Sequence, residues 1–341
     1  IKWWAGIGVA FLVLEAYVLI SWFLSGDVEA TPSGTTPIPQ SDKVLAIVIQ
    51  SVGVVLACGV LYWFLIRPWW RERRLTADGL LLLAVALVYW QDPFLNYTQN
   101  WATINTAFLN VGSWTTQLPG WLSPHGNRFA EAPLWAGVAY IWAVFGAMAI
   151  ANKVMARARA RWPKIGVVGL IGVCFTFIAV FDFIFEVGFM RLGMFAYGGA
   201  IKGLTIFYGH YYQFPIYETI FFGGLWTAFA CLRYFKDDRG LTVVERGLER
   251  VRTTPRRRTA LRFLALCGAV NVLYIVCFNV PIQWFALHAG RWPKDIVSRS
   301  YLTDDFCGPR TTYACSGPAV PIPRGTRSAH IAPDGRLVPA P

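Results

Sequence analysis

The chain has 341 residues, of which 55% are hydrophobic and only 15% are charged, and it contains 16 tryptophans. About a quarter of the residues in an ordinary soluble domain are charged, so this composition excludes that class and predicts an all-α, polytopic membrane protein. The formal net charge of +12 does not indicate nucleic-acid binding. Most basic residues fall in three clusters between apolar runs, which is typical of membrane proteins.

Seven apolar runs have about the length of 20 residues that a helix needs to cross a bilayer. They predict helices over residues 3–24, 44–66, 79–97, 134–151, 165–189, 213–234 and 263–287. We therefore expect a seven-helix transmembrane domain over residues 1–287, followed by a C-terminal tail over residues 288–341.

The connections between these runs differ in charge. Three are strongly basic, namely RPWWRERR (67–74), KVMARARARWPK (153–164) and the segment 233–262, whereas 25–43, 98–133 and 190–212 contain one, one and two Lys or Arg residues. The positive-inside rule then places the N-terminus inside and the tail outside. The expected location is the plasma (inner) membrane, crossed several times.

Two connections and the tail have their own character. The segment 98–133 is rich in Trp, Phe and Leu, so we expect it to fold over the outer mouth of the bundle as a cap. The segment 235–262 is predicted to be a cytoplasmic amphipathic segment. Cys307 and Cys315 flank the stretch CGPRTTYAC and suggest a small disulfide if the tail lies outside the cytoplasm.

Five carboxylates lie inside the apolar runs, where each costs roughly 2.5–3.5 kcal/mol at a helix centre. Glu15 stands alone on its helix, and the other four belong to three later helices. Counted at about 1.5 Å per residue from the cytoplasmic helix ends, all four fall in the outer half of the membrane. A shared polar chamber is the simplest geometry for them. The predicted catalytic residues are Asp92, Asp182, Glu186 and Glu218, and the predicted substrate-binding residues are Asn96, Asn100, His210, Tyr217 and Asn279.

Asp182 and Glu186 are four residues apart and share one helix face. Two like charges close together in a low dielectric do not both ionise, so one is expected to hold a proton beside an ionised neighbour. That supplies a general acid and a general base. The structural alternative is that such carboxylates join helices through hydrogen bonds. No Cys/His spacing typical of a metal site occurs, so we expect neither metal nor cofactor.

Several stretches together resemble one known family. KWWAGIGVAFLVLEAYVLISWFLSGD, YWQDPFLNYTQNW, GSWTTQLPGW, FDFIFEVGFMRLGMFAY, YYQFPIYE and FCGPRTTYACSGPAVPIPR are similar to actinobacterial proteins of the AveC spirocyclase family. The similarity covers essentially the whole chain. It implies the chemistry of that family, which is spiroketal closure on a polyketide precursor and dehydration of it.

A second resemblance is limited to one motif. PIYETIFF at 215–222 is similar to the PxEExxFF motif of the small membrane-bound lycopene cyclases, whose acid is taken to protonate a polyene. In this chain Tyr217 stands at the first glutamate and only Glu218 remains. The departure argues against direct carotenoid cyclisation and marks Glu218 as the acid.

These observations favour an enzyme, a cofactor-independent cyclase or dehydratase acting on a hydrophobic polyketide or isoprenoid lipid. One alternative is a non-enzymatic lipid-binding or accessory subunit of an envelope lipid transport or biosynthesis complex, with membrane proteins as partners. A third is proton-coupled transport, which the lack of a detectable internal repeat disfavours. An enzyme predicts a dead-end pocket at the acids, whereas a transporter or accessory subunit predicts a path or an interface.

Overall fold

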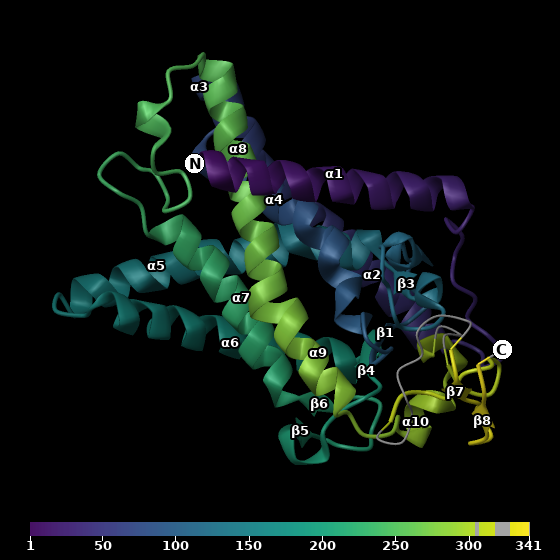
Figure 1. The fold of residues 1–341 in the computed structure, drawn as a ribbon. Coiled ribbons are helices and arrows are strands. Elements are labelled where there is room, and N and C mark those ends of the chain that lie inside the picture. Colours follow the sequence, from purple (N-terminus) through teal and green to yellow (C-terminus); the bar gives the residue numbers. More distant parts are fainter. Residues whose placement is uncertain (304–306, 318–327, 341) are drawn as a thin grey trace.

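The computed structural model describes residues 1–303, 307–317 and 328–340, and helices make up most of it (Figure 1). The α-helices are α1 (Lys2–Ser25), α2 (Gln40–Leu61), α3 (Arg67–Glu72), α4 (Ala77–Leu87), α5 (Phe145–Arg161), α6 (Val167–Arg191), α7 (Ile216–Tyr234), α8 (Pro255–Tyr274), α9 (Val280–Leu287) and α10 (Lys294–Val297).

Several of these helices join into longer rods through π-helical or 3₁₀ turns. The π-helical turns are η1 (Tyr62–Ile66), η5 (Pro133–Gly137), η6 (Tyr140–Val144) and η9 (Ile275–Asn279), and the 3₁₀ segment η2 (Val88–Asn96) extends α4. Shorter 3₁₀ turns are η3 (Thr115–Gln117), η4 (Gly126–Arg128), η7 (Lys202–Leu204), η8 (Leu248–Arg250) and η10 (Ser300–Leu302).

In the part of the chain that the structure describes, six helices are long and apolar enough to cross a membrane: Lys2–Ser25, Gln40–Glu72, Ala77–Asn96, Pro133–Arg161, Val167–Arg191 and Pro255–Leu287. They correspond to six of the seven predicted segments. The seventh, α7, has 19 residues, begins three residues later than predicted and is not among the six. It packs against α5, α6, α8 and η9, and its polar residues lower the apolarity of its sequence.

Among the described residues, three short antiparallel strand pairs lie in the connections and a fourth lies in the C-terminal tail. They are β1 (Ala102–Ile104) with β4 (Phe195–Tyr197), β2 (Val111–Gly112) with β3 (Ala130–Glu131), β5 (Thr205–Ile206) with β6 (Phe214–Pro215), and β7 (His330–Ile331) with β8 (Leu337–Val338). In the first pair Ala102 lies opposite Tyr197. This pair ties the connection after η2 to the connection after α6.

The connections gather at two ends of the molecule. The N-terminus, α3 and the segment 235–254 lie toward the upper left of Figure 1, and the turn between α5 and α6 lies at its left edge. The strand pair β1–β4, α10 and the C-terminal strands lie toward the lower right. All three basic connections therefore share one end of the molecule, and the less basic connections lie at the other.

Helices α1 and α8 make the closest helix contact. A Cβ atom added at Gly8 would lie 1.9 Å from the carbonyl oxygen of Leu264, and one added at Gly268 would lie 2.3 Å from that of Trp4. Glycine at both positions lets the two backbones touch, which is the usual way in which small residues pack membrane helices.

The aromatic segment 98–133 is packed against the helices. Trp114 donates from Nε1 to the backbone oxygen of Trp90 at 2.7 Å and its ring packs edge-on against Trp22. Trp101 is fully buried and stacks on Tyr197, with ring centroids 4.9 Å apart. Tertiary contacts thus order this long connection.

The C-terminal tail contacts that aromatic segment. Trp292 donates from Nε1 to Ser316 Oγ at 3.0 Å, and Ser316 Oγ donates to the backbone oxygen of Asn100 at 2.8 Å. Cys307 and Cys315 form a disulfide just before Ser316. The tail therefore covers part of the aromatic segment 98–133, which itself packs against the helices.

Candidate active site

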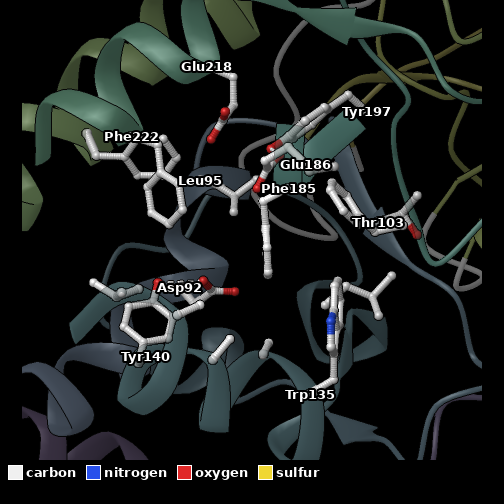
Figure 2. Close-up of a pocket in the computed structure, with 18 of the residues that line it drawn as sticks. Asp92, Leu95, Thr103, Trp135, Tyr140, Phe185, Glu186, Tyr197, Glu218 and Phe222 are labelled. Carbon is white, nitrogen blue, oxygen red and sulfur yellow. Dashed lines mark hydrogen bonds between the residues drawn. The ribbon is translucent and has the colours of Figure 1, made fainter. Parts of the chain in front are cut away.

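A cavity of about 110 Å³ lies among η2, η5, η6, α6, α7, η9 and the strand pair β1–β4 (Figure 2). Its wall is mainly aromatic and aliphatic, and no Lys, Arg or His lines it in the part of the chain that the structure describes. The lining residues are Asp92, Leu95, Ala102, Thr103, Ile104, Phe129, Trp135, Ala136, Ala139, Tyr140, Ala143, Val144, Phe185, Glu186, Phe195, Tyr197, Glu218, Phe222, Trp226 and Phe278.

Three separate elements bring three of the predicted catalytic carboxylates to this cavity. Figure 2 shows Glu218, Glu186 and Asp92 around the same space. Glu218 lies in the first turn of α7, three residues after Pro215. Asp92 precedes Pro93 in η2, where proline is incompatible with a continued α-helix.

The fourth carboxylate, Asp182, lies one turn before Glu186 on the same face of α6, as their spacing predicts. It is fully buried but is not part of the cavity wall. Its Oδ2 accepts a hydrogen bond from the hydroxyl of Thr219 at 2.9 Å. Asp182 therefore lies behind the wall, at the contact between α6 and α7.

Two tyrosines donate hydrogen bonds to the carboxylates of the cavity. The Tyr140 hydroxyl donates to Asp92 Oδ1 at 2.6 Å and also contacts the hydroxyl of Tyr274. The Tyr197 hydroxyl donates to Glu186 Oε2 at 2.8 Å. Burial and the neighbouring Glu186 hold the pKa of Tyr197 well above its ordinary value, so this phenol keeps its proton and acts as a donor.

Asp182, Glu186 and Glu218 form a tight group, with one oxygen of each within 4.8 Å of the others. Asp182 Oδ1 and Glu218 Oε2 are buried without a hydrogen-bond partner. Within residues 1–303, 307–317 and 328–340, no ion pair joins these acids or Asp92 to a basic side chain. Several buried negative charges without a cation are unstable, so protons or a bound cation must balance them.

Oxygen ligands such as these three carboxylates also suit a divalent cation. From the sequence we predict no metal site, because no Cys/His spacing typical of such a site occurs. Glu218 lies on a different helix from the other two acids, so their spacing along the chain does not show that they meet.

Three of the four π-helical turns meet the cavity. Trp135 is in η5, Tyr140 is in η6 and Phe278 is in η9. A π-helical turn inserts an extra residue into a helix and occurs frequently at functional sites. Here the turns place two aromatic rings and one phenol on the cavity wall.

The residues predicted to bind substrate do not line this cavity. Asn96 bonds only to nearby backbone: its Oδ1 accepts from the N–H groups of Trp101 and Ala102, and its Nδ2 donates to the Ala102 oxygen. Asn100 donates to the Pro124 oxygen, and Asn279 donates to Gln91 Oε1. These amides hold connections and helices in place.

His210 and Tyr217, the predicted substrate-binding residues with aromatic rings, also lie outside the cavity wall. Tyr217 is buried next to Glu218 but points away from the cavity wall, where its ring stacks on Phe285 with centroids 4.3 Å apart. His210 is exposed and stacks on Tyr212. Consecutive helix residues project about 100° apart, and Glu218 lines the cavity whereas Tyr217 faces Phe285.

Sequence reasoning missed the three tyrosines of the site, Tyr140, Tyr197 and Tyr274. Tyr140 and Tyr274 are single hydroxyl-bearing residues in otherwise apolar helical stretches, which is a weak signal for a polar partner inside a bundle. Tyr197 follows α6 in β4, and only the strand pairing with β1 returns it to Glu186.

Comparison with known proteins adds one finding. Residues 72–302 match the family model described as Spirocyclase AveC-like, which confirms the resemblance in the sequence. The matched range includes every element from α4 to η10 and every residue of the cavity wall. No curated protein and no solved structure matches the chain.

Proposed function

Because the chain belongs to the AveC-like spirocyclase family, we propose that it is a membrane-embedded, redox-neutral cyclase or dehydratase. Its substrate is a hydrophobic polyketide or isoprenoid lipid, and the reaction is spiroketal-type ring closure or loss of water. The observation that carries the proposal is that Asp92, Glu186 and Glu218 reach one apolar cavity from three different elements without a basic partner.

Ring closure needs a proton donor and a proton acceptor on the same substrate. A protonated Glu218, or Asp182 behind it, gives its proton to a hemiketal hydroxyl, which leaves as water. The ionised Asp92 or Glu186 stabilises the resulting oxocarbenium ion, and a second substrate hydroxyl attacks it. That hydroxyl passes its proton to the same carboxylate, so the net change is the loss of one water. Dehydration uses the same donor and acceptor.

The tyrosines support this division of roles. A carboxylate that accepts a hydrogen bond from a phenol is stabilised in its charged form, and both Asp92 and Glu186 accept one. Glu218 Oε2 is buried without a hydrogen-bond partner in the described part of the chain, and we assign Glu218 as the proton donor. The aromatic wall keeps water from the cation.

The size of the cavity supports a substrate of which one part is enclosed. An apolar cavity of about 150 Å³ holds one benzene molecule, and this cavity measures about 110 Å³. We infer that one ring-forming segment enters it and that the rest of the substrate extends from the cavity between the helices into the lipid.

The proposed setting is the plasma membrane, crossed by seven helices including α7, with the N-terminus inside. The common location of the three basic connections at one end of the molecule (Figure 1) supports this orientation. The cavity is lined by β1 and β4, which belong to the opposite end. The segment 98–133 then covers the site from outside.

The test is comparative lipid mass spectrometry of cells that lack the protein, complemented with wild type, Glu218→Gln or Glu15→Gln. Glu15 is also buried in an apolar helix but does not line the cavity, so it is the matched control. We expect a lipid heavier than its product by one water, or an isomer of equal mass, to accumulate in the deletion and Glu218→Gln strains. A Glu218→Gln strain with the wild-type profile would instead favour a non-enzymatic accessory subunit.

A further inference from the structure

A second cavity lies far from the first, at the end of the molecule that holds the basic connections. It measures about 290 Å³ and is lined mainly by polar atoms. The link between α3 and α4, the segment 235–254 and the first turns of α8 form its wall. The lining residues are Arg74, Leu75, Thr76, Ala77, Arg239, Gly240, Leu241, Leu248, Arg258 and Arg262.

Four arginines from three separate chain segments thus meet at one cavity, and no acidic residue lines it. Two of them are partly occupied. Arg262 Nε contacts Glu245 Oε1 at 2.6 Å and Arg74 Nε contacts Glu72 Oε2 at 2.9 Å. Both pairs use Nε, so the terminal guanidinium nitrogens of these two arginines have no acceptor among the described residues.

The other two arginines are less engaged. Arg239 Nη1 lies 3.9 Å from Glu249 Oε1, which exceeds hydrogen-bonding distance. The Arg258 guanidinium has no hydrogen bond or ion pair to any residue that the structure describes. Most of the donors at this cavity are therefore free for an external acceptor.

The backbone adds to the positive potential. Helix α4 has 11 residues and begins at the cavity wall, where Thr76 is its N-cap and Ala77 its first residue. The N-terminus of a helix carries a partial positive charge and free N–H groups that bind anions. The helix start and the arginines act on the same space.

We propose that this cavity binds a phosphate-bearing anion. Guanidinium groups match phosphate oxygens with paired hydrogen bonds, and the cavity is large enough for a phosphate ester. The two sources of this chemistry are the headgroup of an anionic phospholipid and a soluble phosphate compound. The cavity lies where α4 and α8 begin, at the basic end of the molecule, and basic pockets between membrane helices bind such headgroups.

The experiment uses the full-length protein in detergent and variants in which one charge is removed. Arg258→Gln and Arg74→Gln remove cavity arginines. Arg256→Gln is the matched control because Arg256 is an exposed arginine in the same turn of α8 that does not line the cavity. Native mass spectrometry measures retention of phosphatidylglycerol against phosphatidylcholine with identical acyl chains, and calorimetry measures binding of pyrophosphate to lipid-depleted protein.

We expect the wild type and Arg256→Gln to prefer phosphatidylglycerol, and each cavity variant to bind it about ten-fold more weakly, which is the usual effect of losing one charge-assisted hydrogen bond. Saturable pyrophosphate binding that is lost in the cavity variants would support the same site with a soluble ligand. The proposal is overturned if neither ligand distinguishes Arg258→Gln from Arg256→Gln. Catalysis at the first cavity is not touched by any of these changes, so the two proposals fail separately.

Discussion

At the scale of single residues, the central feature is how each carboxylate is held. Asp92 accepts a hydrogen bond from the hydroxyl of Tyr140, which also contacts the hydroxyl of Tyr274. Glu186 accepts a hydrogen bond from the hydroxyl of Tyr197. Glu218 Oε2 and Asp182 Oδ1 have no partner. The acids of the site therefore differ in their hydrogen-bond donors, which are tyrosines at Asp92 and Glu186 and Thr219 at Asp182, and such a difference in environment separates the roles of acid and base.

The Tyr140→Phe variant tests the proposed base. The change removes the 2.6 Å hydrogen bond to Asp92 and keeps the ring, so we expect turnover to fall about 10- to 100-fold, as for the loss of a hydrogen bond to a charged group. Tyr17→Phe is the control, because Tyr17 is exposed on α1, and it should leave turnover and thermal stability unchanged. Equal turnover of Tyr140→Phe and wild type would remove Asp92 from the mechanism.

The Tyr197→Phe variant tests the hydrogen bond to the second carboxylate, Glu186. Its hydroxyl supplies the hydrogen bond to Glu186 Oε2, and its ring stacks on Trp101 whether or not the hydroxyl is present. We expect turnover to fall about ten-fold or more, with the packing around Trp101 retained in near-ultraviolet circular dichroism. A variant that loses packing along with activity would show that Tyr197 is a structural residue.

The sequence predicts which carboxylates lie near the cavity better than it predicts which asparagines do. Lone carboxylates in apolar runs are costly enough to indicate a shared polar site, and three of the four do line one cavity. Asn96, in contrast, is used by the turn that leads into β1. No local pattern reveals that turn, because it depends on the pairing of β1 with β4, whose sequence lies more than 90 residues away.

At the scale of elements, hydropathy predicts the helices and misses their irregularities. The first helix is predicted over 3–24 and observed as Lys2–Ser25. The π-helical turns η5, η6 and η9 were not predicted, since an inserted residue does not change the average hydropathy of a run. Yet these turns carry Trp135, Tyr140 and Phe278 to the cavity.

The contact between α1 and α8 allows a matched test of packing. A Cβ at Gly8 would overlap the Leu264 carbonyl oxygen, whereas a Cβ at Gly6 would have no atom within 4 Å. We expect Gly8→Ala to destabilise the protein by about 1–3 kcal/mol, the usual cost of overpacking, and Gly6→Ala to be neutral or slightly stabilising. Thermal unfolding in detergent measures both. Similar melting temperatures for the two variants would contradict the observed helix contact.

At the scale of the whole molecule, the fold divides into a basic end and an end made of packed connections. The basic end includes α3, the turn between α5 and α6, and the segment 235–254 (Figure 1). The opposite end includes the aromatic segment 98–133 and the disulfide-linked tail, which contact each other through Asn100 and Ser316. A membrane between the two ends places the first cavity nearer the second end.

Cysteine labelling in intact cells tests that placement. With native free thiols replaced, Thr35→Cys and Ala156→Cys each present an exposed side chain at opposite ends of the molecule. We expect a membrane-impermeant maleimide to label Thr35→Cys and to label Ala156→Cys only after lysis, as the positive-inside rule requires. Labelling of Ala156→Cys in intact cells would reverse the orientation and place the covering segment in the cytoplasm.

The most direct test of the central claim is turnover by purified protein. The lipid that accumulates in the deletion strain would be incubated with wild-type, Glu218→Gln and Glu15→Gln proteins in lipid nanodiscs and followed by mass spectrometry. We expect wild type and Glu15→Gln to convert it to a product that is lighter by one water or is an isomer of equal mass. We expect Glu218→Gln to do so at least about 100-fold more slowly, the lower range for general acid catalysis. Conversion by Glu218→Gln at the wild-type rate would contradict the central claim.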